Sequence, residues 1–190
     1  RKVKSVHLIC HSHWDREWYE PFEAFRFRLT HFFDVLLTCL RQDPGFHFFL
    51  DGQTAMLEDA LAVRPTLLDE LLPYFGRGQL EIGPWYIQAD HFLSSDRAIE
   101  ENLQLGRRMC QHWGILPSNI GYIPDQFGHP ACMPDIFGAA GINVAFAKRG
   151  LSPQDAPLLR WRGKRHSVLL LNQSYDPLNI YPHAGQGARM

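Results

Sequence analysis

Two histidines and two carboxylates follow the first apolar run of the chain. Residues 6–18 read VHLICHSHWDREW, so the apolar residues are followed at once by His11, His13 and Asp15. If the backbone stays extended past residue 10, side chains two positions apart share a face, and these three can converge. Imidazole and carboxylate groups are ligands that zinc prefers. By itself this spacing fits a surface loop of hydrogen-bonded histidines better than a metal site, and the rest of the chain has to strengthen the metal interpretation.

The segments around this loop predict how it is positioned. Residues 6–10 are a short apolar run of the kind that forms a buried parallel strand. Apolar residues then recur at spacings of three and four over residues 20–41, which predicts a helix with one buried face. Ligands of α/β proteins bind at the carboxyl ends of the strands, where His13 and Asp15 are expected.

Strand and helix patterns alternate along the rest of the chain, which predicts the α/β class. Further strands are expected at 46–50, 79–82, 120–123 and 144–147, and further helices at 54–62, 66–75, 95–113 and 133–140. Residues 158–162 and 167–171 flank a Gly-Lys-Arg turn and predict a hairpin or a pair of adjacent strands. We expect one domain over residues 1–190, with loop or disorder at 173–190, where no periodicity remains.

Four of the predicted strands end in acids, imidazoles or aromatic rings. The right-handed crossover rule makes these strands parallel, so their carboxyl ends should lie on one rim. Polar groups gathered on such a rim favour an enzyme over a binding or structural module. The residues concerned are His13 and Asp15, then Asp51, then Trp85 and Asp90, then Asp125 and His129.

Several of these residues have an ordinary structural alternative. Asp51 could contact a substrate or cap the helix that begins near residue 54. Trp18 and Trp85 could be core residues or a stacking platform for a sugar. His129 could support a neighbouring group instead of binding a ligand.

A purely structural role explains Asp125 less well than it explains the other acids. It follows a predicted strand in the turn PDQFGHP, which is rich in small and restricted residues. Such a turn fixes a carboxylate in place, close to a ligand. Opposite His13 and Asp15, it would complete a set of three metal ligands.

Composition restricts the possible partners and the location. The net charge is -1, the pI is about 6.9 and no polybasic tract occurs, so neither nucleic acid nor an anionic membrane is an expected partner. No apolar run approaches the roughly 20 residues of a membrane span, and no signal peptide is evident. The four cysteines lack Cys-x-x-Cys spacing, which favours reduced, buried thiols in a cytoplasmic protein. A chain that begins at Arg1 could also be part of something longer.

Four segments together resemble a known family. Residues 11–18 (HSHWDREW), 50–53 (LDGQ), 83–86 (GPWY) and 125–129 (DQFGH) are similar to the N-terminal catalytic domain of glycoside hydrolase family 38, the retaining α-mannosidases. The DREW ending resembles the bacterial branch, which includes mannosylglycerate hydrolases, whereas animal enzymes more often read DPGW. The similarity runs from about residue 5 to residue 171. It implies the N-terminal portion of a seven-stranded parallel (β/α) barrel-like domain, followed in the family by a helical bundle and β-rich domains.

The resemblance also implies roles for individual residues. His13 and Asp15 would bind zinc, and Asp125 would be both the third ligand and the catalytic nucleophile. The family's fourth ligand, a histidine, and its general acid/base, an aspartate, would lie beyond Met190, so this chain alone is expected to be inactive. The candidate substrate contacts are Trp18 beneath the mannose ring, Phe127 and Arg149 along the same pocket, Asp90, Asp51 and Trp85.

The implied reaction is hydrolysis of an α-mannoside with net retention. Zinc would orient the sugar hydroxyls while Asp125 attacks the anomeric carbon. The expected partners are the mannoside and either further domains of a longer chain or a second copy. Two other functions stay open: a metal-dependent carbohydrate deacetylase, with water as the nucleophile, and a carbohydrate-binding fragment without catalysis.

Overall fold

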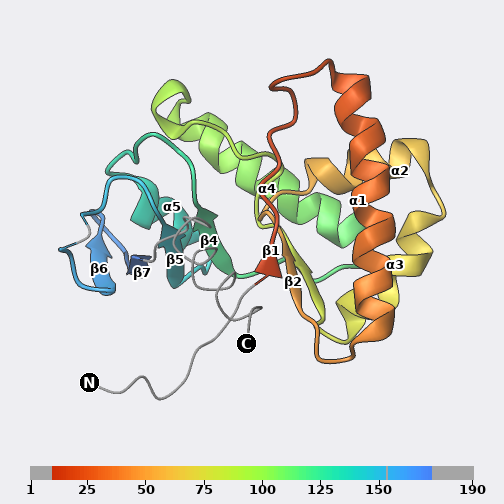
Figure 1. The fold of residues 1–190 in the computed structure, drawn as a ribbon. Helices are drawn as coiled ribbons and strands as arrows, with labels where there is room; N and C mark the ends of the chain where they lie inside the picture. The colour runs from red at the N-terminus through yellow and green to blue at the C-terminus, as the bar shows by residue number, and fades with distance from the viewer. Residues whose placement is uncertain (1–9, 153, 173–190) are drawn as a thin grey trace, which may run out of the picture. The chain divides into compact units, whose positions relative to one another are not determined.

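The computed structural model describes residues 10–152 and 154–172, which form two compact units (Figure 1). Within that range, unit 1 comprises residues 10–88 and 97–118, and unit 2 comprises residues 89–96 and 119–172 apart from 153. Each unit is described by itself. Most of the strand predicted at 6–10 and all of the loop predicted at 173–190 lie outside the described residues. The single domain expected over residues 1–190 stays a prediction.

Unit 1 contains a parallel sheet of three strands in the order β1-β2-β3. The ladder pairs Cys10 with Phe48 and Leu50 with Ile82, so β2 is the central strand. The parallel direction agrees with the sequence-based prediction and places the carboxyl ends of all three strands on one edge. The elements are β1 (Cys10–His11), α1 (Phe22–Gln42), β2 (Phe48–Leu50), α2 (Ala55–Val63), α3 (Leu67–Gly76), β3 (Leu80–Ile82) and most of α4 (Asp96–His112).

Helix α1 confirms the helix predicted at 20–41, but it begins two residues later. Pro21 occupies the N-cap position, and the residue before a proline is disfavoured in helical geometry, so Glu20 stays outside. The helix buries the face expected from its spacing, including Phe25, Leu29 and Phe33. Of these, Leu29 and Phe33 belong to a core that also contains residues of β2, α2, α3 and β3.

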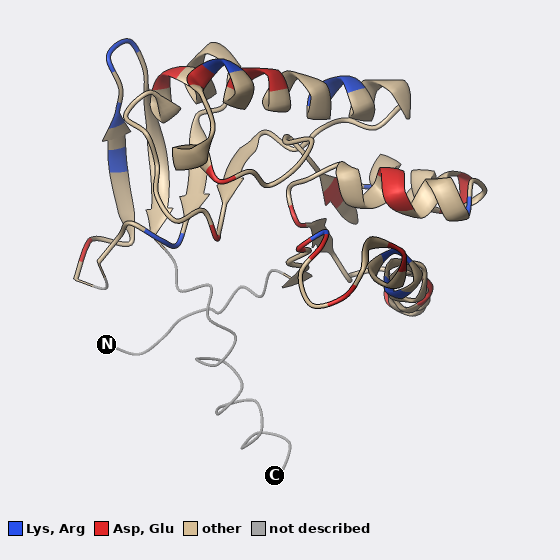
Figure 2. Cartoon of the chain, turned by 90° about the horizontal axis from the view of Figure 1, so that it is seen from above, with Lys and Arg blue, Asp and Glu red and all other residues tan. Residues whose placement is uncertain are grey.

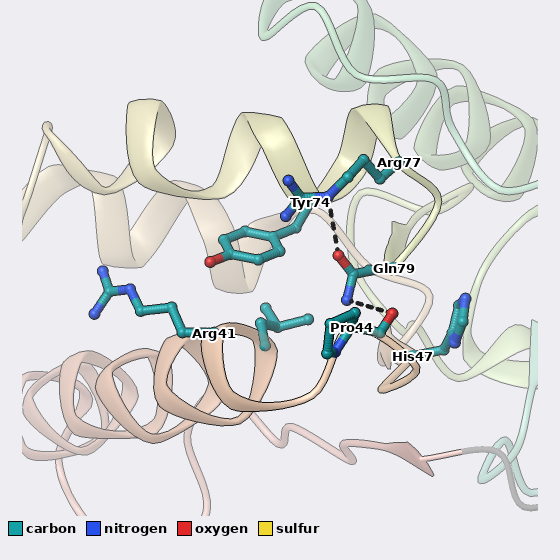
Figure 3. Close-up of a pocket in the computed structure, with 7 residues that line it drawn as sticks. Arg41, Pro44, His47, Tyr74, Arg77 and Gln79 are labelled. Atoms are coloured by element: carbon teal, nitrogen blue, oxygen red, sulfur yellow. Dashed lines mark hydrogen bonds between the residues drawn. The ribbon is translucent and has the colours of Figure 1, made fainter.

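Strand β2 is two residues shorter than predicted because the preceding turn is held by a side chain. The Gln79 amide nitrogen lies 3.4, 3.2 and 3.3 Å from the carbonyl oxygens of Asp43, Pro44 and Phe46. Figure 3 shows the bond to Pro44. This turn and Gln79 border an open pocket of about 520 Å³. Because Pro44 and Gln79 precede β2 and β3, the pocket lies at the opposite end of the strands from the residues predicted to do chemistry.

Gly106 lets α4 approach the backbone that follows β3. A Cβ at this position would lie 2.2 Å from the carbonyl carbon of Trp85 and 2.4 Å from the Pro84 carbonyl oxygen. Backbone atoms cannot move aside cheaply, so the cost of overpacking exceeds the gain in helix propensity.

We expect Gly106→Ala to lower the free energy of unfolding by about 1–3 kcal/mol, measured by urea denaturation. Gly76→Ala is the matched control, because Gly76 is also helical and a Cβ there would meet nothing within 4 Å. Equal stability of the two variants would contradict the packing account.

Unit 2 is built on a mixed sheet with the strand order β4-β5-β7-β6. β4, β5 and β7 are parallel, and β6 runs antiparallel to β7, which confirms the hairpin alternative for the last two strands. A 3₁₀ turn at 91–93 was not predicted. The elements are η1 (His91–Leu93), β4 (Ile120–Ile123), α5 (Met133–Ala139), β5 (Val144–Ala147), β6 (Leu158–Arg162) and β7 (Ser167–Asn172).

The turn between β6 and β7 is fixed by Asp135 of α5. The Asp135 carboxylate accepts backbone hydrogen bonds from Lys164 (2.8 Å), Arg165 (2.7 Å) and His166 (2.7 Å). These hydrogen bonds lower the pKa of Asp135 to about 2, and the bond from Arg165 has the largest effect. A Cβ on Gly163 would lie 2.7 Å from the same carboxylate, so glycine is required there. The basic residues of the turn and of β6 appear in blue in Figure 2, whereas α1 and α4 carry both signs of charge.

The described residues therefore confirm a mixed α/β fold, in sheets of three and four strands. Of the four cysteines, which the sequence predicted to be buried thiols, only Cys110 is buried, and none forms a disulfide within the described residues. None of the helices within the described residues is long and apolar enough to cross a membrane.

Candidate active site

His13 lies between two carboxylates in the loop that follows β1. Its Nε2 atom is 3.5 Å from Oδ1 of Asp15, and its Nδ1 atom is 3.6 Å from Oδ1 of Asp51. Both separations exceed normal hydrogen-bond lengths, so the contacts are electrostatic. The structure thus brings together two of the predicted metal ligands, His13 and Asp15. It also places Asp51, the acid that follows β2, next to the other nitrogen of the imidazole.

Asp51 is buried and organises this loop. Its Oδ2 atom accepts hydrogen bonds from the Trp14 backbone N–H (2.6 Å) and from Nε2 of Gln53 (2.7 Å). Helix α2 has Thr54 at its N-cap and no side-chain cap hydrogen bond, so the helix-cap alternative for Asp51 is wrong. The side chain is 0% exposed, and contact between Asp51 and a substrate stays a prediction.

A second anchor holds the same loop further along. The Arg16 guanidinium donates two hydrogen bonds of 2.8 Å to the carboxylate of Asp59 on α2, and it lies 4.8 Å from the ring centroid of Phe22. The Asp59 hydrogen bond is the main reason that the pKa of Arg16 is raised. Sequence reasoning missed this pair. An acid within the otherwise apolar stretch of a predicted helix was the available signal, because a buried carboxylate needs a partner.

The two candidate stacking residues of unit 1 differ in exposure. Trp18 is 58% exposed and stacks on Tyr19, with ring centroids 4.9 Å apart and planes 14° apart. An exposed indole beside the His13 loop fits the expected sugar platform. Trp85 is only 1% exposed, which favours the core alternative, and its contact with a substrate stays a prediction.

Unit 2 places Arg149 against Asp125. Asp125 follows β4 and Arg149 follows the neighbouring parallel strand β5, so their side chains meet at the carboxyl ends of the two strands. Arg149 donates from Nε (2.8 Å) and Nη2 (2.6 Å) to Oδ1 of Asp125. The guanidinium also lies 4.4 Å from the ring centroid of Phe127, which is 72% exposed. Three of the predicted site residues are therefore in contact.

His129 supports Arg149 from the backbone side. Its Nε2 atom lies 3.2 Å from the Arg149 carbonyl oxygen, which only accepts, so Nε2 carries the proton. This contact fits the supporting role that the sequence left open for His129. Asp90 caps the 3₁₀ turn by accepting from the Phe92 N–H at 3.2 Å, and its contact with a substrate stays a prediction.

His91 is a buried imidazole that sequence reasoning did not single out. It is 1% exposed, and its ring centroid lies 6.1 Å from that of His129. Burial first, and then the proximity of His129, lower the pKa of His91 to about 4, although Asp90 acts in the opposite direction. Burial also lowers the pKa of His129. Both rings are therefore neutral near pH 7.

We expect acid to destabilise the fold through His91. Because the folded state has the lower pKa, its stabilisation is complete above the unfolded pKa of 6.5 and is lost as the pH falls toward about 4. Between pH 7.5 and pH 5 the loss from this group is about 2 kcal/mol. Urea unfolding at the two pH values tests this, because His91→Leu should reduce the pH dependence by that amount. An unchanged pH dependence in a folded variant would contradict it.

The three expected metal ligands are divided between the units. His13 and Asp15 belong to unit 1 and Asp125 to unit 2, and each unit is described by itself. Among the described residues, no group of three or more His, Cys, Asp or Glu side chains is arranged to hold a metal ion. The three-ligand site therefore stays a prediction.

Comparison with known proteins shows which family the chain belongs to. The family model for the glycosyl hydrolases family 38 N-terminal domain matches residues 3–188. The chain belongs to glycosyl hydrolase family 38. The resemblance inferred from HSHWDREW, LDGQ, GPWY and DQFGH is thereby confirmed.

Relatives and solved structures agree with this membership. The chain is 46% identical over 151 residues to a Halalkalibacterium halodurans protein named "Putative mannosylglycerate hydrolase", covering 79% of this chain and 17% of that protein. It is similar to the crystal structure of an alpha-mannosidase from Enterococcus faecalis, with a TM-score of 0.81 and 36% identity over 86% of this chain and 19% of that one. Another Enterococcus faecalis structure, a protein in glycosyl hydrolase family 38, gives a TM-score of 0.72 and 30% identity, covering 95% of this chain and 21% of that one. The chain therefore spans about a fifth of the length of these relatives.

Proposed function

We propose that the chain carries the nucleophile and part of the metal site of a retaining α-mannosidase. Membership in family 38 supports the glycosidase class. The observation that carries the proposal is the Asp125 carboxylate, which two hydrogen bonds from Arg149 hold beside the exposed ring of Phe127. A fixed carboxylate at the end of a parallel strand is suited to attack the anomeric carbon of a bound sugar.

The residues of the β1 loop fit a zinc ion. Zinc bonds to histidine nitrogen and carboxylate oxygen are about 2.0–2.2 Å long, so two tetrahedral ligand atoms lie about 3.3–3.6 Å apart. The Nε2 atom of His13 and the Oδ1 atom of Asp15 are 3.5 Å apart. We infer that His13, Asp15 and Asp125 hold the ion. When bound, it supplies a Lewis acid that orients the sugar hydroxyls and stabilises negative charge on them.

The chain's own residues define the covalent step. Asp125 attacks the anomeric carbon as the bond to the leaving oxygen breaks, which yields a mannosyl ester of Asp125. Arg149 holds Oδ1 of Asp125 in place before attack, and His129 holds the backbone of Arg149. Trp18 offers an indole face to the sugar ring. Water then cleaves the ester and configuration is retained.

The proposed reaction also needs a general acid/base and a complete substrate pocket. The carboxylic acid that protonates the leaving oxygen is assigned to no residue of this chain, so the chain alone should not turn over substrate. The two sheets are proposed to belong to a seven-stranded barrel-like domain of a longer cytoplasmic protein or of an assembly of copies. Phe127, Arg149 and Asp90 are proposed as further contacts around the mannoside, whereas the predicted contacts of Asp51 and Trp85, which are 0% and 1% exposed, stay predictions.

Trapping the covalent intermediate tests the proposal. A 2-deoxy-2-fluoro-α-mannosyl fluoride should label Asp125 of the full-length protein, because the C2 fluorine slows both steps whereas the fluoride leaving group speeds only formation of the ester. Peptide mass mapping after proteolysis locates the adduct. Deacetylation without an adduct would favour the deacetylase alternative, and mannose binding without turnover would favour the binding module.

A further inference from the structure

The two peptide groups that join Trp14 to His13 and to Asp15 are each held by a buried side chain. The Trp14 N–H donates to Oδ2 of Asp51 at 2.6 Å, and the Trp14 carbonyl oxygen accepts from Nε2 of Gln53 at 2.7 Å. Asp51 is 0% exposed and Gln53 is 1% exposed. The backbone N–H and the backbone carbonyl of Trp14 therefore both have buried side-chain partners. We call Asp51 and Gln53 the Trp14 clamp.

The Trp14 clamp is braced by the ends of two strands. Nε2 of Gln53 also donates to Oδ2 of Asp51 at 2.7 Å, which ties the two clamp residues together. After β3, Gln88 donates from Nε2 to the Asp51 carbonyl oxygen (2.9 Å) and from its backbone N–H to Oε1 of Gln53 (3.3 Å). The clamp is thus part of a connected network, and such networks hold one geometry firmly when every member is satisfied.

The backbone at Asp51 adopts a conformation that has a cost. Its φ is 45°, in the left-handed region that residues with a Cβ rarely occupy. This conformation accompanies a carboxylate that faces the Trp14 N–H with Oδ2 and the His13 ring with Oδ1. One side chain therefore contacts both the backbone and the imidazole of the predicted metal-binding loop.

We propose that Asp51 and Gln53 are positioning residues that set the separation of His13 and Asp15 by fixing the backbone of Trp14 on both sides of its Cα. The proposal rests on the proposed function, in which this pair binds zinc. An ionised carboxylate only accepts hydrogen bonds, so Asp51 favours the tautomer with the His13 proton on Nδ1. Nε2 then presents its lone pair toward Asp15, 3.5 Å away, as a shared cation requires.

Matched substitutions separate positioning from general stability. Gln53→Met keeps the side-chain volume but removes the amide. Gln79→Met removes a similarly buried amide that holds the turn before β2, at the other end of the same strands. Both variants of the full-length protein should unfold at lower urea concentration than wild type.

Zinc affinity, measured by competition with a chromophoric chelator, should distinguish the two variants. We expect a 10- to 100-fold loss in Gln53→Met, the range typical of groups that orient metal ligands, and less than a twofold change in Gln79→Met. Wild-type affinity in a folded Gln53→Met variant, or an equal loss in Gln79→Met, would overturn the positioning role.

A measurement without metal tests the Trp14 clamp independently. The Trp14 amide should exchange slowly with solvent in wild type and in Gln79→Met, and faster in Gln53→Met. The ¹⁵N shifts of the His13 ring should report a protonated Nδ1 in wild type, and this preference should weaken in Asp51→Asn, whose amide can donate. If wild-type protein bound no zinc, the proposed metal site would fail, and the exchange and tautomer results would still decide the clamp. Fast Trp14 exchange in wild type would refute it.

Discussion

Replacing Asp125 with asparagine is expected to lower the turnover of an activated aryl α-mannoside on the order of 10⁴-fold or more in the full-length protein. The substitution preserves the size of the side chain and an oxygen that Arg149 can contact, but it removes the nucleophilic carboxylate. Losing a nucleophile costs orders of magnitude, whereas losing one binding contact costs far less. Mannoside binding should largely persist, because the amide oxygen still accepts from Arg149.

Steady-state kinetics with a good leaving group measure this effect in kcat, and calorimetric titration of a mannoside measures binding. Asp155→Asn is the control, because Asp155 is another unit 2 carboxylate that accepts a backbone hydrogen bond, from Ser152 at 2.7 Å, in an exposed loop. Its turnover should match that of wild type. Substantial turnover by Asp125→Asn would place the nucleophile elsewhere and favour the mechanism in which water attacks.

The arrangement of elements could be predicted because hydrophobic spacing reports it directly. The buried face of α1 follows the three-and-four pattern, and the pairing of β1, β2 and β3 is parallel as the crossover rule requires. The errors lie at element ends, where side chains decide. Pro21 delays α1, and the Gln79 amide holds the turn that shortens β2.

The contacts of the candidate site were less accessible to sequence reasoning. The parallel rule predicts that Asp125 and Arg149 end neighbouring strands, but their hydrogen bonds depend on how two turns aim the side chains. The hydrogen bond of Asp51 could not be predicted for the same reason. Its left-handed φ of 45° directs the carboxylate to the Trp14 N–H and away from the N-terminus of α2. A pattern of residue types does not encode such a local conformation.

Residues with similar positions in the sequence pattern differ in how deeply the fold buries them. Trp18 and Trp85 both follow predicted strands, yet one is 58% and the other 1% exposed. Trp85 is covered where α4 passes over its backbone at Gly106, so the difference depends on the packing of a distant helix. His91 is another example, because its lowered pKa arises from burial that no local pattern indicates.

Replacing Asp15 with alanine is expected to weaken zinc binding by the full-length protein by more than about a hundredfold. Removing a ligand takes away one of the few bonds to the ion, which costs more than the 10- to 100-fold effect typical of groups that only orient ligands. The Asp15 carboxylate lies at zinc-sharing distance from His13, 3.5 Å between Oδ1 and Nε2. His13→Ala should have a similar effect and should also weaken mannoside binding, since the ion orients the sugar hydroxyls.

Glu17→Ala is the matched control for this prediction. Glu17 is an exposed carboxylate two residues further along the same loop, so its removal changes the net charge equally without touching the His13 and Asp15 pair. Zinc content after dialysis and chelator competition should show a large loss for Asp15→Ala and almost none for Glu17→Ala. Equal losses would mean that long-range charge, and not coordination, governs binding. Unchanged zinc in Asp15→Ala would remove Asp15 from the metal site, and with it the role proposed for the Trp14 clamp.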